Sequence, residues 1–186
     1  MTQPNRKLTN AVLYLLRGCR SRPGVTHLLK MLYYADYWHY RSYLRVITGA
    51  EYVALERGPV LDQYKEVFAA LEASGVLCRR EVPVEGKSEP KVELSAEVEP
   101  DESMFSPNEL ATLERVIAEC GHLNGYALSR RTHYEGPWQF AWDPNQVGRK
   151  IPRITFRWLD NLPDDEERAL AREHFAATYP NGLVLT

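Results

Sequence analysis

The pattern of apolar and polar positions predicts a domain built around one central helix. Residues 28–44 read LLKMLYYADYWHYRSYL and place apolar side chains on nearly every side of a helix. A helix of this kind lies inside a domain, and charged side chains such as Lys30 and Asp36 make it too polar to span a bilayer. We therefore predict a central aromatic helix that is capped by Thr26 and surrounded by the rest of the chain.

The same periodicity predicts the elements around this helix. They are helix 8–19, strand 51–56, helix 60–74, the hairpin of 77–84 and 92–98, helix 106–121, helix 125–133 and a last helix from Pro163 followed by an apolar tail at 183–185. Gly58-Pro59 would begin helix 60–74, because proline at the first helical position loses no hydrogen bond. The acidic stretch 97–102 is the best candidate for a mobile connection. The pattern predicts an α+β fold, mainly α, with a small antiparallel sheet.

Length, charge and cysteine usage narrow the class of protein. The 186 residues suit one domain with a short appendage, and the net charge of −2 gives little support to non-specific nucleic-acid binding. The basic run 149–157 would contact a phosphate backbone or form a solvated face. Three widely separated cysteines indicate reduced packing residues in a cytosol. The polar N-terminus has no secretion signal, so we expect a cytoplasmic protein that is not anchored to a membrane.

Asp36 is the most informative polar residue. A carboxylate among packed aromatic rings needs hydrogen-bond donors or a cation, so Asp36 either holds two parts of the fold together or belongs to a site. His39 lies three residues further along the same face, and a His–carboxylate pair would support an enzyme. His133 and Glu135 stand beside tryptophans, but their spacing is not that of metal ligands. We expect a structural Asp36, no metal and no cofactor.

A DNA-binding regulator is the alternative function. Helices followed by a β-hairpin are typical of a winged helix, in which 60–74 would be the recognition helix. Lys65 is its single cation, and Asp62, Glu66 and Glu72 would repel phosphates.

Aromatic side chains are candidates for contact with a protein partner. They exceed what one helix needs for packing, and aromatic residues anchor many interfaces, although any one of them also suits a core. The candidates are Tyr37, Trp38, Tyr40, Tyr43, Trp138, Phe140 and Trp142.

Four short motifs occur in a distinctive order. They are lysine, leucine, tyrosine and aspartate within 30–36; glycine, acid, tyrosine and valine within 49–53; glycine and proline at 58–59; and threonine and histidine at 132–133 followed by a tryptophan at 138. In this combination residues 8–150 resemble the Panacea domain, the SocA-like antitoxin family of bacteria and phages. Motif residues that we expect to support the fold are Lys30, Asp36, Tyr52, Gly58, Pro59, Thr132 and His133.

The resemblance implies an antitoxin that neutralises an adjacently encoded protein toxin by direct binding, without catalysis. It also implies a second route, because one family member delivers its toxin to a cellular protease. The expected domain spans residues 1–155, and residues 156–186 would add a C-terminal helix and a short strand packed on it.

Overall fold

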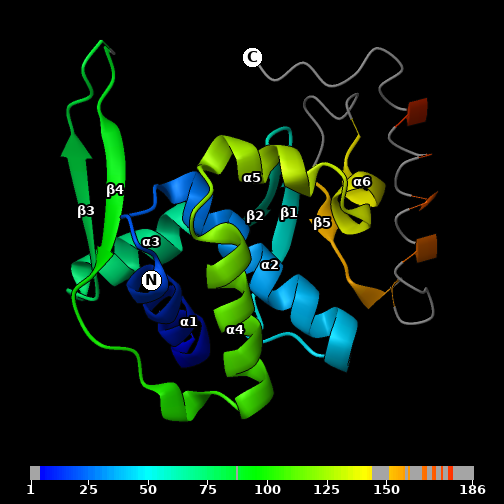
Figure 1. Cartoon of the computed structure of the whole chain (residues 1–186), viewed down its shortest axis with the longest axis horizontal. Helices are drawn as coiled ribbons and strands as arrows, with labels where there is room; N and C mark the ends of the chain where they lie inside the picture. The colour runs from blue at the N-terminus through cyan, green and yellow to red at the C-terminus, as the bar shows by residue number, and fades with distance from the viewer. Residues whose placement is uncertain are drawn as a thin grey trace.

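The computed structural model describes residues 5–86, 88–143, 151–157, 159 and scattered positions between 165 and 177. The fold is α+β and mainly α, as the sequence predicts (Figure 1). Its helices are α1 (Arg6–Gly18), α2 (Val25–Tyr43), α3 (Tyr64–Ala73), the 3₁₀ helix η1 (Glu102–Met104), α4 (Pro107–Cys120), α5 (Gly125–Thr132) and α6 (Gly136–Ala141). Its strands are β1 (Tyr52–Leu55), β2 (Gly58–Leu61), β3 (Leu77–Val82), β4 (Lys91–Ala96) and β5 (Arg153–Ile154).

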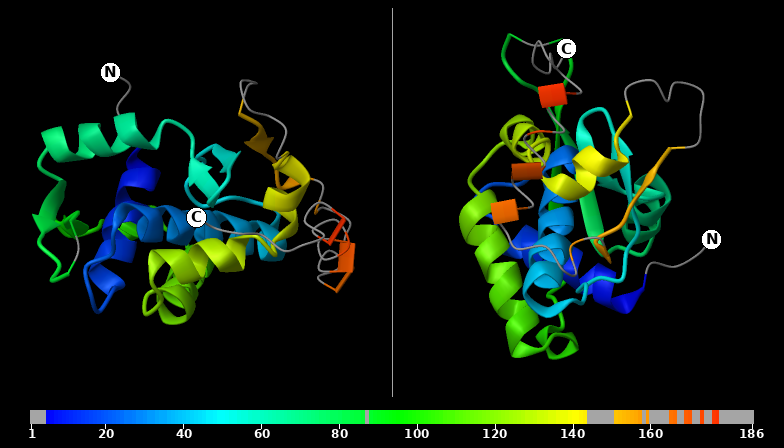
Figure 2. Two further views of the ribbon diagram at one scale, coloured as in Figure 1. Left: turned by 90° about the horizontal axis from the view of Figure 1, so that it is seen from above. Right: turned by 90° about the vertical axis from the view of Figure 1, so that its right-hand side faces the viewer.

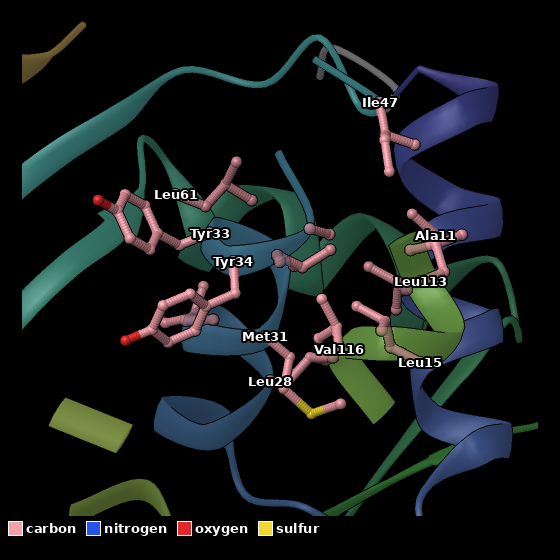
Figure 3. Close-up of a cluster of buried hydrophobic side chains, with 14 of the residues drawn as sticks. Ala11, Leu15, Leu28, Met31, Tyr33, Tyr34, Ile47, Leu61, Leu113 and Val116 are labelled. Carbon is pink, nitrogen blue, oxygen red and sulfur yellow. The ribbon is translucent and has the colours of Figure 1, made fainter. Parts of the chain in front are cut away.

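Helix α2 is the central element, and the prediction that it is surrounded on all sides is confirmed. Every residue from His27 to His39 is buried. Helices α1, α4 and α5 and strands β2 and β4 all pack against it. Leu28 and Met31 lie among apolar side chains of α1 and α4, including Leu15 and Leu113 (Figure 3). The core is therefore continuous around α2.

Local signals predict the starts of α4 and α5 correctly and the cap of α2 incorrectly. Ser106 and Glu109 form the reciprocal capping box at α4, and the Asn124 side chain accepts from Ala127 N at α5. The Thr26 cap is wrong, because α2 begins one residue before Thr26 and its N-cap is Gly24, which has no side chain to bind the open backbone N–H groups.

The predicted helix start at Gly58-Pro59 is also wrong. Both residues lie in β2, which pairs antiparallel with β1 in a sheet of order β2–β1–β5. Ala54 faces Pro59, but its N–H donates to Pro152 O on the other side of β1. Pro59 thus occupies an edge-strand position where its missing N–H costs no ladder bond. The helix that follows begins later, at Tyr64.

The β3–β4 hairpin is confirmed, and it projects from the helices (Figure 1). Leu94 N donates to Pro23 O, which attaches β4 to the turn between α1 and α2. The acidic stretch after it is bonded at both ends, since Glu97 N donates to Val76 O and Asp101 N to the Asn10 side chain. These hydrogen bonds attach both ends of the stretch that we expected to be a mobile connection.

The C-terminal region reaches the core through β5. Arg153, from the basic run, lies 2.5 Å from a carboxylate oxygen of Glu51 and 3.6 Å from one of Asp62. Phe156 packs against the rings of Tyr33 and Tyr52. The described positions between 165 and 177 are helical, whereas the tail at 183–185 lies outside the described residues. The boundary at residue 155 stays a prediction.

No helix in the described ranges is both long and apolar enough to cross a membrane.

Candidate partner-binding surface

Asp36 is fully buried and accepts hydrogen bonds from the segment that follows α2. Its Oδ1 accepts from Ile47 N at 2.7 Å and Thr48 N at 2.8 Å. Its Oδ2 accepts from the hydroxyls of Thr48 and Tyr52, the latter at 2.7 Å. Burial raises the pKa of Asp36, and these hydrogen bonds oppose the shift. The carboxylate thus joins α2 to the loop before β1 and to β1 itself.

Asp36 and His39 do not form the pair on which the enzyme alternative rested. His39 Nδ1 lies 3.0 Å from Thr112 Oγ1 of α4, and burial lowers the pKa of His39. Each side chain serves a different contact of α2. In the part of the chain that the structure describes, no three His, Cys, Asp or Glu side chains gather as a metal site would require.

Lys30 is fully buried on the same helix and reaches the glycine–proline motif at 58–59. Its Nζ donates to Pro59 O at 2.6 Å, and burial lowers the pKa of Lys30 to about 7. Gly58 has a φ of +95°, and a Cβ on it would collide with Thr132 Oγ1 and lie 3.0 Å from Lys30 Nζ. Only glycine fits this close approach of β2 to α2 and α5.

Two ring nitrogens hold the turn between β1 and β2. His133 Nε2 lies 3.0 Å from Glu56 O, and Trp138 Nε1 donates to Leu55 O at 2.9 Å. The ring centroids of His133 and Trp138 are 4.3 Å apart. Burial lowers the pKa of His133 to about 4, so the ring is neutral at pH 7 and donates its Nε2 proton to the carbonyl. We call Lys30, Thr132, His133 and Trp138, with the turn they surround, the hairpin clamp.

The aromatic candidates divide by burial. Trp138, Tyr37 and Trp38 are 0, 4 and 8% exposed, which leaves a partner little access to them in this conformation. Tyr40 and Trp142 are half-buried. Two candidates, Tyr43 at 44% and Phe140 at 47%, present large exposed rings.

Two further exposed tyrosines were not singled out from the sequence. Tyr126 is 59% exposed and Tyr134 is 53% exposed, on either side of Arg130. Each lies four residues from Arg130, and this helical spacing, along the polar side of helix 125–133 and into the residue after it, is the signal that could have identified them.

A groove of about 560 Å³ adjoins the N-terminal end of α5. The turn between α1 and α2, strand β4 and the turn between α4 and α5 line it. Its charged or titratable lining side chains are Arg22, His27, Lys91 and His122.

Comparison with protein families gives a match to the model described as antitoxin SocA-like, Panacea domain, over residues 28–139. The matched segment covers more than half of the chain. The protein belongs to this Panacea-domain family. The domain match runs from α2 into α6 and contains Asp36 and the whole hairpin clamp, whereas α1 and β5 lie outside it. The match is shorter at both ends than the resemblance over 8–150. No curated protein and no solved structure matches the chain.

Proposed function

We propose that this protein is a cytoplasmic antitoxin that neutralises an adjacently encoded protein toxin by binding it directly. The observation that carries the proposal is the Panacea-domain match across residues 28–139. It includes the central helix and both of the polar clusters that hold loops against that helix. Neutralisation by binding needs a folded scaffold with an exposed contact surface and requires no catalytic group.

The geometry supports different roles for the two groups of residues, with buried motif residues holding the fold and exposed residues contacting the toxin. Asp36, Lys30 and His133 all bind backbone groups inside the protein. Such residues support the fold, and toxin contact then falls to exposed side chains outside these buried clusters. Variants of the two groups are expected to differ, since the first loses stability together with neutralisation and the second loses neutralisation alone.

The DNA-binding alternative receives less support from the geometry. The expected recognition helix starts late, and in α3 Lys65 shares the exposed face with Glu66. Arg79 on the hairpin forms an ion pair with Glu72 of α3 at 2.9 Å. A cation that is paired in this way has less charge to offer a phosphate backbone.

The test is expression of the adjacent open reading frame in a bacterial host, alone and together with this protein. We expect growth arrest by the first product, relief by this protein, and a complex that survives affinity purification and gel filtration. Asp36→Ala serves as a folding-defective comparison and should fail to relieve arrest. A non-toxic neighbour, or relief without any complex, would contradict neutralisation by direct binding.

A second measurement separates masking from delivery to a protease. Toxin lifetime is followed by immunoblot after translation is stopped, with and without this protein. An unchanged lifetime together with relief of arrest indicates masking. A shortened lifetime that is restored when the host's ATP-dependent proteases are deleted indicates delivery for degradation.

A further inference from the structure

The outer side of α5 and the residues that follow it carry an exposed aromatic and basic surface. Tyr126 and Arg130 lie one helical turn apart, and Tyr134 follows after a tighter turn in which His133 N and Tyr134 N bind the carbonyls three residues back. Leu128 and Thr132 point the other way and are buried. Seen from above, α5 lies along one border of the molecule with α2 on its inner side (Figure 2). We call Tyr126, Arg130 and Tyr134 the α5 outer face.

The charge of this region differs from that of the whole chain. The protein has a net charge of −2, yet Arg130 has no ion-pair partner among the described residues. Beside it, Glu119 is shared by two arginines, since Arg115 lies 2.7 Å and Arg131 3.0 Å from its carboxylate. These two guanidiniums also cover the Trp38 ring, at 4.4 and 5.2 Å from its centroid. Helix α5 itself carries two arginines, Arg130 and Arg131, and no carboxylate.

The groove at the start of α5 extends the same surface. Asn124 and Gly125 line it and directly precede Tyr126. On its other walls stand Arg22 and Lys91, of which Lys91 lies 3.2 Å from Glu93. A partner segment lying along α5 would thus meet basic side chains at both the groove and the outer face.

We infer that the α5 outer face and its adjoining groove form the toxin-contacting surface, and that the occupant is an acidic segment of the toxin. The inference rests on the proposed antitoxin function. Carboxylates on the toxin complement Arg130 and the groove cations, and the tyrosine rings supply rigid contact area at little entropic cost. Tyrosine and arginine side by side are the residue types that dominate binding energy at many interfaces.

The test compares two matched double variants in the full-length protein. Tyr126→Ala/Arg130→Glu alters the α5 outer face, and Tyr43→Ala/Arg45→Glu makes the same changes at the exposed end of α2. Binding to the product of the adjacent open reading frame is measured by biolayer interferometry, and relief of growth arrest is scored in parallel. Thermal melting confirms that both variants stay folded, with Tm within about 2 °C of the wild type.

The α5 variant is expected to bind at least about a hundredfold more weakly and to lose neutralisation, and the α2 variant to bind within about threefold of the wild type. Arg130→Gln should weaken binding less than Arg130→Glu, because it removes attraction without adding repulsion. Unaltered binding by the α5 variant, with a toxin that the wild type still binds, would overturn the inference and leave the antitoxin function intact. Failure of the wild type itself to bind would overturn the function.

Nucleic acid is the competing occupant of a face with tyrosine and arginine. A fluorescent single-stranded oligothymidine is titrated by anisotropy into the same proteins. Oligonucleotide binding that disappears in Tyr126→Ala/Arg130→Glu while toxin binding persists would assign the face to nucleic acid and overturn the inference. Absence of oligonucleotide binding, with toxin binding lost in that variant, supports the acidic protein segment.

Discussion

Asp36 and Lys30 offer a comparison between two buried ionisable groups on one helix. Both side chains are fully buried, and each binds a different segment against α2. Asp36 accepts from two backbone N–H groups and two hydroxyls, whereas Lys30 donates to the carbonyl of Pro59. Burial raises the pKa of Asp36 against those opposing hydrogen bonds, but it lowers the pKa of Lys30 to about 7.

The difference shows that burial alone does not define how a charge is accommodated. The carboxylate replaces its lost hydration with four donors, so it keeps the loop before β1 in place through its charge. The amine approaches neutrality near pH 7, so it contributes as a long packed side chain with a hydrogen bond. Removing the acid should therefore be far more damaging than removing the amine.

The largest expected effect is that of Asp36→Ala. This change leaves four donors without their acceptor and should lower the free energy of unfolding by about 3–5 kcal/mol, as measured by urea denaturation. Asp36→Asn is the control, because it keeps Oδ1 as an acceptor and the two hydroxyls can turn to receive its amide protons. Its loss should be smaller. Equal stability of the alanine variant and the wild type would remove the carboxylate from its supporting role.

Gly58→Ala tests how closely strand β2 approaches Lys30 and Thr132. The added Cβ would collide with Thr132 Oγ1, and alanine would also have to adopt the φ of +95° that Gly58 has. We therefore expect a loss of about 2–4 kcal/mol in the free energy of unfolding. Thr132→Ala removes the colliding oxygen, and the double variant should recover part of the loss measured against the two single changes. Strictly additive losses would show that backbone strain, and not the collision, dominates.

The smallest effect is the pH dependence that Lys30 imposes. Because its pKa is about 7 when folded and about 10.4 when unfolded, the unfolded chain binds the extra proton and stability should rise with pH across this window. Between about pH 7 and 8.5 the gain is on the order of 1–2 kcal/mol. Above that range the thiols of Cys19 and Cys120, whose pKa values burial raises to about 11 and about 12, act in the opposite direction.

Lys30→Met keeps the length of the side chain and loses the titration. Its stability at pH 7 should lie within about 1 kcal/mol of the wild type, and its slope between pH 7 and 8.5 should be flatter. Urea midpoints at closely spaced pH values measure both quantities. A slope equal to that of the wild type would locate the titrating group elsewhere.

The start of α4 and the burial of α2 depend on residues close together in the sequence, and both were predicted correctly. The α4 start followed from Ser106, Pro107 and Glu109, which satisfy one another within a single turn. The burial of α2 followed from apolar residues on all of its sides. Gly58-Pro59 was assigned wrongly because the pair suits either a helix start or an edge strand, and the choice depends on Lys30 and Thr132, which are distant in sequence.

The candidate site was only partly predictable for the same reason. The need of Asp36 for donors was evident from its apolar neighbours, but Ile47 and Thr48 as donors depend on how the chain returns after α2. Helical spacing identifies which side chains share a face and does not tell which face is solvated. The interface candidates therefore included the buried Trp138 and omitted the exposed Tyr126.

The hairpin clamp has a consequence for how the sequence of this domain could diverge. His133, Trp138 and Lys30 all bind main-chain carbonyls, those of Glu56, Leu55 and Pro59. Every residue has a carbonyl oxygen, whatever its side chain. The exposed Glu56 can therefore be replaced by other residues while the hydrogen bonds of the clamp are kept. A library randomised at this position should yield mostly folded, protease-resistant clones, and one randomised at Gly58 should yield almost none.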